Sequence, residues 1–561
     1  MKEKVKTGVL MMISFIIPLL VLGYSKQLDP GSIRYITAPI GAEGIQYDFF
    51  SYYREVFLGV GGIVLLLLEG RRSNLYKKAG VVMTCLSILS CIFAESKEVA
   101  LWGINGRFEG AIAQIAYMAI FIAGLEVFRE KRKRDLVVNA MLISSVVVFI
   151  IGIMQFFGYN FLENEIGYKL ITGFQSERFG DIVFRFGENA IYGTHFNPNY
   201  MGSYAVIMFF IGLGRYLTRR KNLLYGCYTL LAYGNLVGSH SRAGQLGYYG
   251  GLLLFLLFMG GDIKKYWRKL TVIMILIYGV WQGMDTWSQE FLGRRMDFSS
   301  GERAEIYSIK PIDRGVVIEG EHNLIIRETL DSIEFFDDQG RKIEVAREGG
   351  IAYLDRKGYR NYRIQRSGSN ENLYLLSNKD FSYELLYSDE KFYTRDHRGK
   401  YTPVREVERF KLLDGYENKG SKRGYIWSRS IPLLWTRPLL GWGQDNYVLA
   451  FPQDDFFGKG LFYGNRGMLV DKPHNYFLQI GINNGLFYLA ITLILFGVYF
   501  IKGLIKEVVG EISESSYIFI ASTAYMITLL FNDSVVSVAP VFWCIFSMGI
   551  VLVDEREKRF L

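Results

Sequence analysis

A single histidine marks the point where a long polar segment runs into an apolar stretch. His474 stands in Asp471-Lys-Pro-His474-Asn475, and the apolar run begins at Tyr476. An ordinary imidazole has a pKa of about 6.5, so most of it is neutral near pH 7 and can accept a proton. His474 is therefore a candidate general base, and Asn475 either orients its ring or caps the following helix. The alternative is that both residues belong to an ordinary helix start.

Two arginines stand in short motifs that suit an anionic ligand. Arg242 lies in Ser241-Arg-Ala-Gly244, where the serine and the glycine allow an anion to approach closely. Arg423 lies just before an amphipathic segment, near an expected helix N-terminus, where the helix dipole favours anions over cations. A guanidinium binds phosphate oxygens in bidentate fashion and keeps its charge. A bound phosphate would account for both positions, although an arginine at a helix end also often reaches for lipid headgroups.

Polar side chains also gather in the stretch 192–200, Tyr-Gly-Thr-His-Phe-Asn-Pro-Asn-Tyr. Pro198 suits the first turn of a helix and Asn197 suits its cap. One interpretation is a plain helix start. The other is that His195, Asn197 and Asn199 line a cavity that opens outward and supports the chemistry of the residues above.

The elements that must position these residues are apolar. Half of the 561 residues are hydrophobic, with 38 Tyr, 41 Phe and a positive mean hydropathy, which is too apolar for an ordinary soluble protein. Runs near the ~20 residues that cross a bilayer predict about twelve membrane spans. They cover about 8–24, 54–69, 79–94, 110–128, 136–157, 191–217, 223–238, 244–260, 270–288, 474–501, 516–532 and 535–553. The first run lacks a small-residue cleavage site at 22–25, so we expect a retained helix rather than a signal peptide.

Lysine and arginine alternate between the loops on the two sides of these spans. One side carries clusters such as 131–134, 215–221 and 264–269, and the short loops of the other side carry few cations. The positive-inside rule makes the cation-rich side, with both chain termini, cytoplasmic. All five histidines then face the extracytoplasmic side of a plasma membrane: His195, His240, His322, His397 and His474. The net charge of +9 thus reflects topology rather than a nucleic-acid site.

Several kinds of chemistry are excluded by these patterns. An extracytoplasmic site has no access to cytosolic ATP or nucleotide sugars, and the sequence has no Walker or Rossmann glycine pattern in a suitable context. All four cysteines fall within predicted spans, so we expect no disulfide framework. No Cys/His spacing is typical of zinc. We therefore expect neither a metal nor another cofactor.

The segment 289–473 is the only sizeable region without membrane spans, and it separates a membrane domain at 1–288 from a second one at 474–561. Its middle, about 308–412, alternates apolar and polar residues between turn clusters, which predicts an inserted β domain. Within it, His322 and His397 are expected to be ordinary surface residues. The stretch at about 424–436 has apolar residues at near-helical spacing, which predicts a helix lying in the membrane interface.

Four short motifs together resemble the O-antigen ligase and polymerase superfamily of bacterial membrane glycosyltransferases. They are Ser-Arg-Ala-Gly at 241–244, Arg-Gly-x-x-Trp at 423–427, Pro-Leu-Leu-Gly-x-Gly at 438–443 and His-Asn-x-x-Leu-Gln at 474–479. The resemblance covers the second half of the chain. The first spans match only in hydropathy, and the β insert is not part of the family's usual pattern.

This resemblance implies an all-α polytopic membrane protein with a GT-C-like fold, here carrying an inserted extracytoplasmic β domain. It also implies inverting transfer of a glycan from an undecaprenyl-pyrophosphate donor to a glycan, lipid or protein acceptor, without a metal. His474 would then be the catalytic base, and Arg242 and Arg423 would bind the pyrophosphate. Ser241, Asn475, His195, Asn197 and Asn199 would support them.

Other functions stay open from the sequence. A polymerase of the same superfamily needs the same donor, acceptor and base as a ligase. A flippase or transporter of lipid-linked oligosaccharides also suits twelve spans, but it should place ionisable residues near mid-membrane rather than at the outer boundary. A sensor that uses the β domain to bind a ligand is a third possibility. The sequence does not specify the sugar, the acceptor or the oligomeric state.

Overall fold

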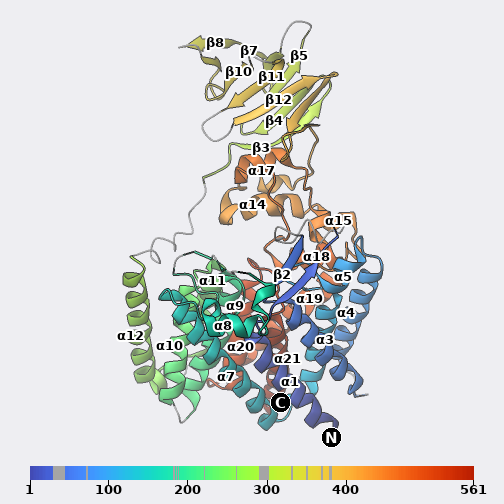
Figure 1. Ribbon diagram of the computed structural model, residues 1–561. Coiled ribbons are helices and arrows are strands. Elements are labelled where there is room, and N and C mark those ends of the chain that lie inside the picture. Colours follow the sequence, from blue (N-terminus) through green and yellow to red (C-terminus); the bar gives the residue numbers. More distant parts are fainter. Residues whose placement is uncertain are drawn as a thin grey trace. The chain divides into compact units, whose positions relative to one another are not determined.

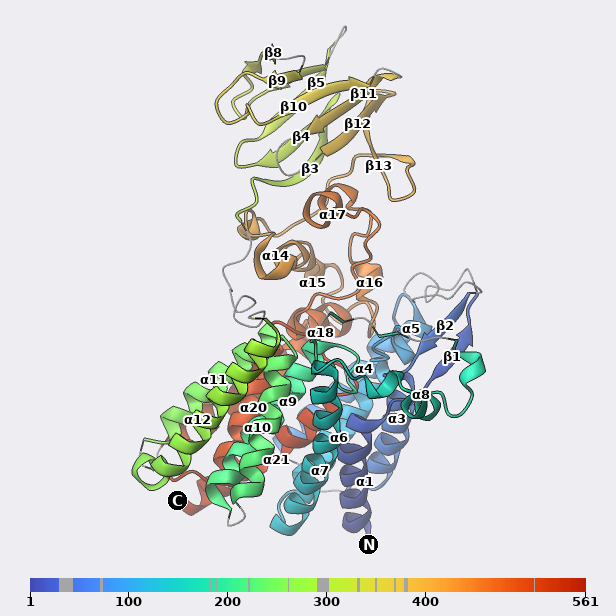
Figure 2. The same cartoon turned by 60° about the vertical axis from the view of Figure 1, so that its left-hand side comes forward.

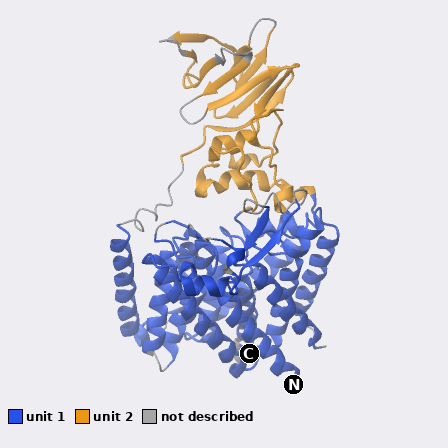
Figure 3. Ribbon diagram, viewed as in Figure 1, with its two compact units in different colours: residues 1–297, 437–446, 474–561 blue, residues 298–436, 447–473 orange. Residues whose placement is uncertain are grey.

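The computed structural model describes residues 1–29, 44–70, 74–180, 183–184, 186–187, 189–219, 222–260, 262–289, 302–329, 333–348, 351–367, 370–377, 382–508 and 510–560 (Figure 1). Arg220 and Lys221 of the cation-rich segment 215–221 lie outside this part of the chain, as do residues 290–301 at the start of the segment 289–473. The chain divides into two compact units (Figure 3). Unit 1 comprises residues 1–297, 437–446 and 474–561, and unit 2 comprises residues 298–436 and 447–473.

Unit 1 is mostly helical, and its long helices run roughly side by side (Figures 1 and 2). Its helices are α1 (Lys2–Leu19), α3 (Tyr52–Leu67), α4 (Leu75–Ile92), α5 (Lys97–Trp102), α6 (Ala111–Val127), α7 (Lys131–Phe156), α8 (Glu165–Ile171), α9 (Pro198–Thr218), α10 (Asn222–Gly238), α11 (Arg242–Phe258), α12 (Ile263–Trp287), α18 (Tyr476–Asn484), α19 (Leu486–Glu507), α20 (Glu514–Thr528) and α21 (Ala539–Phe560). A short antiparallel hairpin of β1 (Tyr24–Gln27) and β2 (Ile45–Asp48) and the 3₁₀ turns η1 (Phe161–Glu163) and η2 (Ser176–Arg178) complete the described elements.

Four described helices are long and apolar enough to cross a membrane, namely α4, α7, α9 and α19, and α6 is a shorter apolar helix. Helices occur in all twelve ranges that the hydropathy pattern predicts as spans. Length and composition identify only these four described helices as possible membrane spans. The count of twelve spans and the orientation of the chain therefore stay predictions.

The interior of unit 1 forms around α9. Nearly every residue of this helix is buried, and it packs against α10 on one side and α20 on another. The outer faces of α4, α12 and α19 differ, because they expose large apolar side chains such as Ile88, Ile275 and Ile494. Large apolar side chains exposed along long helices are compatible with a membrane environment.

The range 474–501, expected as one apolar helix, is broken into α18 and α19. Gly485 separates them with a φ of 88°, a conformation that favours glycine. The segment 437–446 packs into this break, because Leu486 N–H donates to the Pro438 carbonyl (2.7 Å) and Trp442 N–H donates to the Ile482 carbonyl (2.9 Å). The Pro-Leu-Leu-Gly-x-Gly motif therefore belongs to unit 1 and stabilises the start of α19.

Unit 2 carries two antiparallel sheets in which consecutive strands are neighbours (Figure 2). The first sheet comprises β3 (Ile306–Ile312), β4 (Gly315–Gly320), β5 (Leu324–Glu328), β6 (Ile333–Phe336) and β7 (Lys342–Ile343). The second comprises β8 (Val345–Glu348), β9 (Ile351–Leu354), β10 (Arg363–Ser367), β11 (Asn370–Ser377), β12 (Ser382–Ser388), β13 (Lys391–Arg395) and β14 (Tyr401–Pro403). Apolar side chains from both sheets form one buried cluster, and these strands occupy most of the range 308–412 predicted for the β insert.

The rest of unit 2 is helical. It comprises η3 (Lys411–Leu413), α14 (Lys419–Ser430), α15 (Leu433–Thr436), α16 (Tyr447–Ala450) and α17 (Phe456–Tyr463). The helix expected at about 424–436 is interrupted between α14 and α15, where Pro432 follows the end of α14. Ile426 is buried within unit 2, whereas Trp435 is 70% exposed. The apolar side of α14 is thus partly used for packing inside the protein.

Candidate functional site

His474 forms a pair with an acidic residue from the loop between α20 and α21. Its Nδ1 lies 3.1 Å from Oδ2 of Asp533, whose side chain is only 2% exposed, while the His474 side chain is 33% exposed. An ionised carboxylate can only accept a hydrogen bond, so the proton of His474 lies on Nδ1, and Nδ1–H donates a hydrogen bond to Asp533. The other ring nitrogen, Nε2, is then left with a lone pair. This arrangement is that of an oriented general base.

The backbone at His474 adopts an unusual conformation. Its φ is 50°, in the left-handed region, which costs free energy for a residue other than glycine. Asn475 follows as the N-cap of α18, where its Oδ1 accepts from Leu478 N–H (3.0 Å) and its Nδ2 donates to the Leu530 carbonyl (2.9 Å). Asn475 therefore caps the helix and also fixes the loop that carries Asp533.

The same loop reaches the start of α9. Asn532 Nδ2 donates to the Asn199 carbonyl (3.2 Å) and to Ser203 Oγ (2.9 Å). Asn197 caps α9, since its side chain accepts from Asn199 N–H (2.8 Å). Asn197 thus caps α9, and the Asn199 carbonyl connects the α9 start to the loop that carries Asp533.

The α9 start in turn contacts the start of α11. Ser241 Oγ lies 3.5 Å from the Asn199 carbonyl and caps α11 by accepting from Gly244 N–H (3.1 Å). Arg242 is the first residue of α11 and is half-buried. Unit 1 therefore links His474 to Arg242 through three short segments, 529–534, 197–203 and 241–244.

His195 is placed differently from the other predicted residues. It is fully buried, its ring lies 4.5 Å from that of Tyr204, and neither ring nitrogen has a hydrogen-bond partner in the described part of the chain. His195 is therefore an interior residue that packs against Tyr204 of α9.

Arg423 lies in unit 2. It follows three residues in the left-handed region, Gly420, Ser421 and Lys422, and it begins the regular part of α14. Its Nη1 donates to the Gly420 carbonyl (3.4 Å), and the side chain is half-buried. Trp427, one turn later, donates from Nε1 to the Pro473 carbonyl (2.8 Å), so α14 is fixed to the residue that directly precedes His474 in the chain.

An apolar groove is formed in part by α11, the helix that begins at Arg242. It has a volume of about 430 Å³ and is lined by α10, α11 and α12. Gln245, one turn after Arg242, contributes a polar atom to this lining, and five aromatic residues contribute rings: Tyr233, Tyr248, Tyr249, Tyr278 and Trp281. An apolar, aromatic lining of this kind suits the chain of a lipid.

Several buried charged residues of unit 1 escaped sequence analysis. Arg107 forms a 2.7 Å ion pair with Asp445, and both side chains are almost fully buried. Glu109 and Asp533 are also buried. A usable signal was present, since Glu109 directly precedes an apolar run and Asp533 lies in a polar triplet between two predicted spans.

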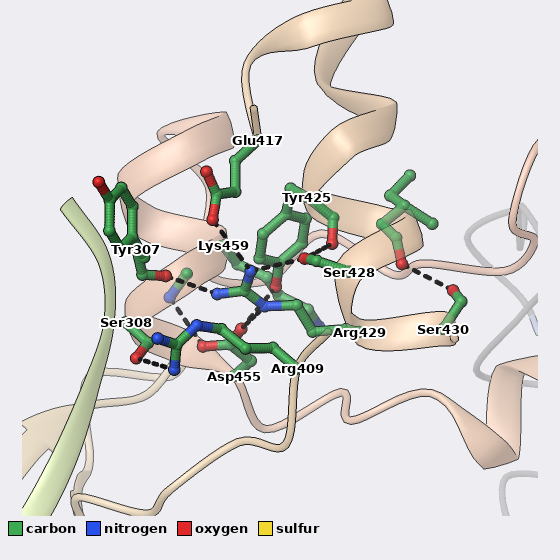
Figure 4. Close-up of polar contacts among 12 residues, drawn as sticks. Tyr307, Ser308, Arg409, Glu417, Tyr425, Ser428, Arg429, Ser430, Asp455 and Lys459 are labelled. Carbon is green, nitrogen blue, oxygen red and sulfur yellow. Dashed lines mark hydrogen bonds and ion pairs between the residues drawn. The ribbon is translucent and has the colours of Figure 1, made fainter. Parts of the chain in front are cut away.

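Unit 2 contains a second buried polar cluster, centred on Arg429 (Figure 4). Arg429 donates to the Tyr307 carbonyl (2.7 Å), forms an ion pair with Asp455 (3.3 Å) and lies over the ring of Tyr425. Burial raises the pKa of Glu417 to about 7 and lowers the pKa of Lys459 to about 8. Because its members come from β3, α14 and α17, the cluster fixes the first sheet to the helical part of unit 2.

The described residues contain no group of three or more His, Cys, Asp or Glu that could hold a metal ion. In comparisons with known proteins, no family model, curated protein or solved structure matches the chain.

Proposed function

We propose that the protein is a plasma-membrane glycosyltransferase of the O-antigen ligase type, which transfers a glycan from an isoprenoid pyrophosphate to an acceptor hydroxyl on the extracytoplasmic face. The observation that carries this proposal is the pairing of His474 with Asp533 on a loop that is hydrogen-bonded to the α9 start, which in turn contacts the start of α11 at Arg242. A base and a phosphate-binding cation on linked segments suit attack on an activated sugar.

The proposed reaction uses His474 Nε2 to take the proton from the acceptor hydroxyl. The hydroxyl oxygen forms a bond to the anomeric carbon while the bond from that carbon to the pyrophosphate oxygen breaks, so the anomeric configuration inverts. Asp533 holds the imidazole in the required tautomer and stabilises the imidazolium that forms. Arg242 and Arg423 stabilise the charge that develops on the departing pyrophosphate.

The membrane part of the proposal rests on the exposed apolar faces of α4, α12 and α19 and on the four helices of sufficient length. We propose twelve spans, cytoplasmic termini and an extracytoplasmic unit 2, because this orientation places His474 and Arg242 on one side. The aromatic groove of α10, α11 and α12 would take the first isoprene units of the donor while Arg242 binds its phosphates.

Reconstitution into proteoliposomes with a purified lipid-linked oligosaccharide tests the proposal. We expect the glycan to appear on the acceptor, and the loss of this product in the His474→Ala variant while expression and insertion stay normal. Undiminished transfer by His474→Ala would rule out the base. A single product would indicate a ligase, and a ladder of products would indicate the polymerase of the same superfamily. Translocation of the donor without new glycosidic bonds would instead identify a flippase.

The groove is tested by varying the lipid chain. With Trp281→Ala, we expect a higher KM for a donor with a long isoprenoid chain and little change for a donor with a chain of two or three isoprene units. Trp267→Ala is a matched control, because Trp267 lies on the same helix, is exposed and does not line the groove. Equal KM changes for both donors would contradict the assignment of the groove.

A further inference from the structure

Glu109 is a buried carboxyl group directly before α6. Its residue is 2% exposed, and its Oε1 accepts from Tyr117 Oη (2.9 Å) and from Ser534 Oγ. Its other oxygen, Oε2, is buried and has no hydrogen-bond partner among the residues that the structure describes. A buried carboxylate with one unsatisfied oxygen is costly, so this side chain favours the uncharged acid.

The surroundings of Glu109 act in the same direction. Burial, and then the negative charge of Asp445, raise the pKa of Glu109 to about 8, while Arg107 and the two hydrogen bonds oppose the rise. Arg107 is already paired with Asp445 at 2.7 Å. Among the described residues, phenols from four helices also interact with Glu109: Tyr117, Tyr476, Tyr488 and Tyr525. Glu109 is therefore mostly a neutral acid at pH 7.

Ser534, which donates to Glu109, is the residue after Asp533. Its backbone N–H also lies 3.4 Å from Oε1 of Gln479 on α18. On the other side of Asp533, Asn532 is fixed to the α9 start. Asp533 thus lies between two anchored neighbours, and Glu109 is the residue that accepts from the Ser534 hydroxyl.

We propose that Glu109 is a positioning residue, which fixes Ser534 and thereby holds the Asp533 carboxylate beside His474. The proposal rests on the proposed role of His474 as the base. Oε1 of Glu109 accepts from Ser534 and from Tyr117 whether or not the carboxyl group is protonated. The position of the 532–534 segment therefore depends on the presence of this acceptor.

Two substitutions in the full-length protein separate this role from a general effect on folding. Glu109→Gln keeps the carbonyl that accepts from Tyr117 and Ser534 and stays neutral at every pH. Glu109→Ala removes the acceptor. Glu98→Ala serves as the matched control, because Glu98 is a half-exposed glutamate on α5.

The first measurement does not require glycan transfer. It is the rate at which diethyl pyrocarbonate modifies His474, followed by mass spectrometry of the peptide that contains it, in protein reconstituted in nanodiscs. We expect Glu109→Ala to change this rate to the value found for Asp533→Asn, and Glu109→Gln to keep the wild-type rate. An unchanged rate in Glu109→Ala overturns the proposal.

The second measurement is the rate of transfer. We expect Glu109→Ala to lower the rate by about 100-fold, as a misplacement of about 1 Å does at a catalytic group. Glu109→Gln, which keeps the acceptor for Ser534, should transfer at close to the wild-type rate. A Glu109→Gln variant that folds but is as slow as Glu109→Ala overturns the role of Glu109 as the acceptor. If the wild type transfers no glycan at all, the proposed function fails, and the modification rates still decide the role of Glu109.

Discussion

His474 and Asp533 are 59 residues apart in sequence, yet Nδ1 of the first lies 3.1 Å from Oδ2 of the second. The loop between α20 and α21 brings them together, and contacts of Asn475 and Asn532 fix the part of that loop that precedes Asp533. An exposed imidazole edge backed by a buried carboxylate is a common way to hold one tautomer of a histidine. This pair, more than either residue alone, makes the start of α18 a candidate catalytic site.

The Asp533→Asn variant tests the importance of this pairing. The amide no longer requires a proton on Nδ1, so the wrong tautomer becomes accessible and the imidazolium loses its counter-charge. We expect kcat for glycan transfer to fall by about 10²- to 10⁴-fold, with little change in KM. Asp454→Asn, at a half-exposed aspartate of unit 2, should keep the wild-type rate. An Asp533→Asn variant with full activity would leave His474 without an orienting partner.

The two arginines are tested by their ability to bind phosphate. We expect Arg242→Ala and Arg423→Ala each to lower kcat/KM for the lipid-linked donor by about 10²- to 10³-fold. Lysine at either position should restore only part of the activity, because it binds phosphate as a point charge rather than as a fork. Arg398→Ala, at an exposed hairpin turn of unit 2, is the control. Normal donor kinetics in both alanine variants would separate the arginines from the donor.

The stability of unit 2 should depend on pH through Glu417 and Lys459. The folded-state pKa of Glu417 is raised to about 7, so its contribution to the free energy of unfolding is greatest below pH 4.5 and is lost as the pH rises to about 7, by up to about 1.4 kcal/mol per pH unit. Burial lowers the folded-state pKa of Lys459 to about 8, so its contribution to the free energy of unfolding grows as the pH rises from 8 to 10.5. From these two groups alone, stability has its minimum between pH 7 and 8.

Thermal unfolding of the full-length protein, followed by tryptophan fluorescence, measures this dependence. We expect Glu417→Gln to remove the fall in Tm between pH 4.5 and 7. Glu408→Gln, at an exposed glutamate, should keep this fall. A fall in Tm that persists in Glu417→Gln would assign the pH dependence to another group.

Gly441 should resist substitution because it lies against the end of α18. Its φ is 69°, and a Cβ atom added there would stand 2.4 Å from the Asn483 backbone. We expect Gly441→Ala to lower the free energy of unfolding by more than about 2 kcal/mol. Gly158 has a similar φ of 85°, but an added Cβ would meet no described atom within 4 Å, so Gly158→Ala should show only the backbone strain of about 1 kcal/mol. Equal losses in the two variants would show that the contact with α18 is unimportant.

Hydropathy and strand alternation could predict where helices and sheets occur, because both depend on local sequence periods. The partner of His474 could not be found in this way, since the contact with Asp533 depends on how α18 packs against the α20–α21 loop. The break at Gly485 was also hidden, because an apolar run looks continuous whether or not a remote segment such as 437–446 inserts into it. The buried position of His195 is likewise a result of tertiary packing, which its polar sequence neighbours do not reveal.

The chain passes between the two units four times, after residues 297, 436, 446 and 473. A protease that cuts once within unit 2 would therefore leave its two fragments attached to unit 1 by covalent connections on both sides of the cut. The same arrangement sets the order of maturation during synthesis. Unit 1 lacks His474 and Asp533 until unit 2 has been made in full, so a ribosome that stops within unit 2 releases a chain without its proposed base.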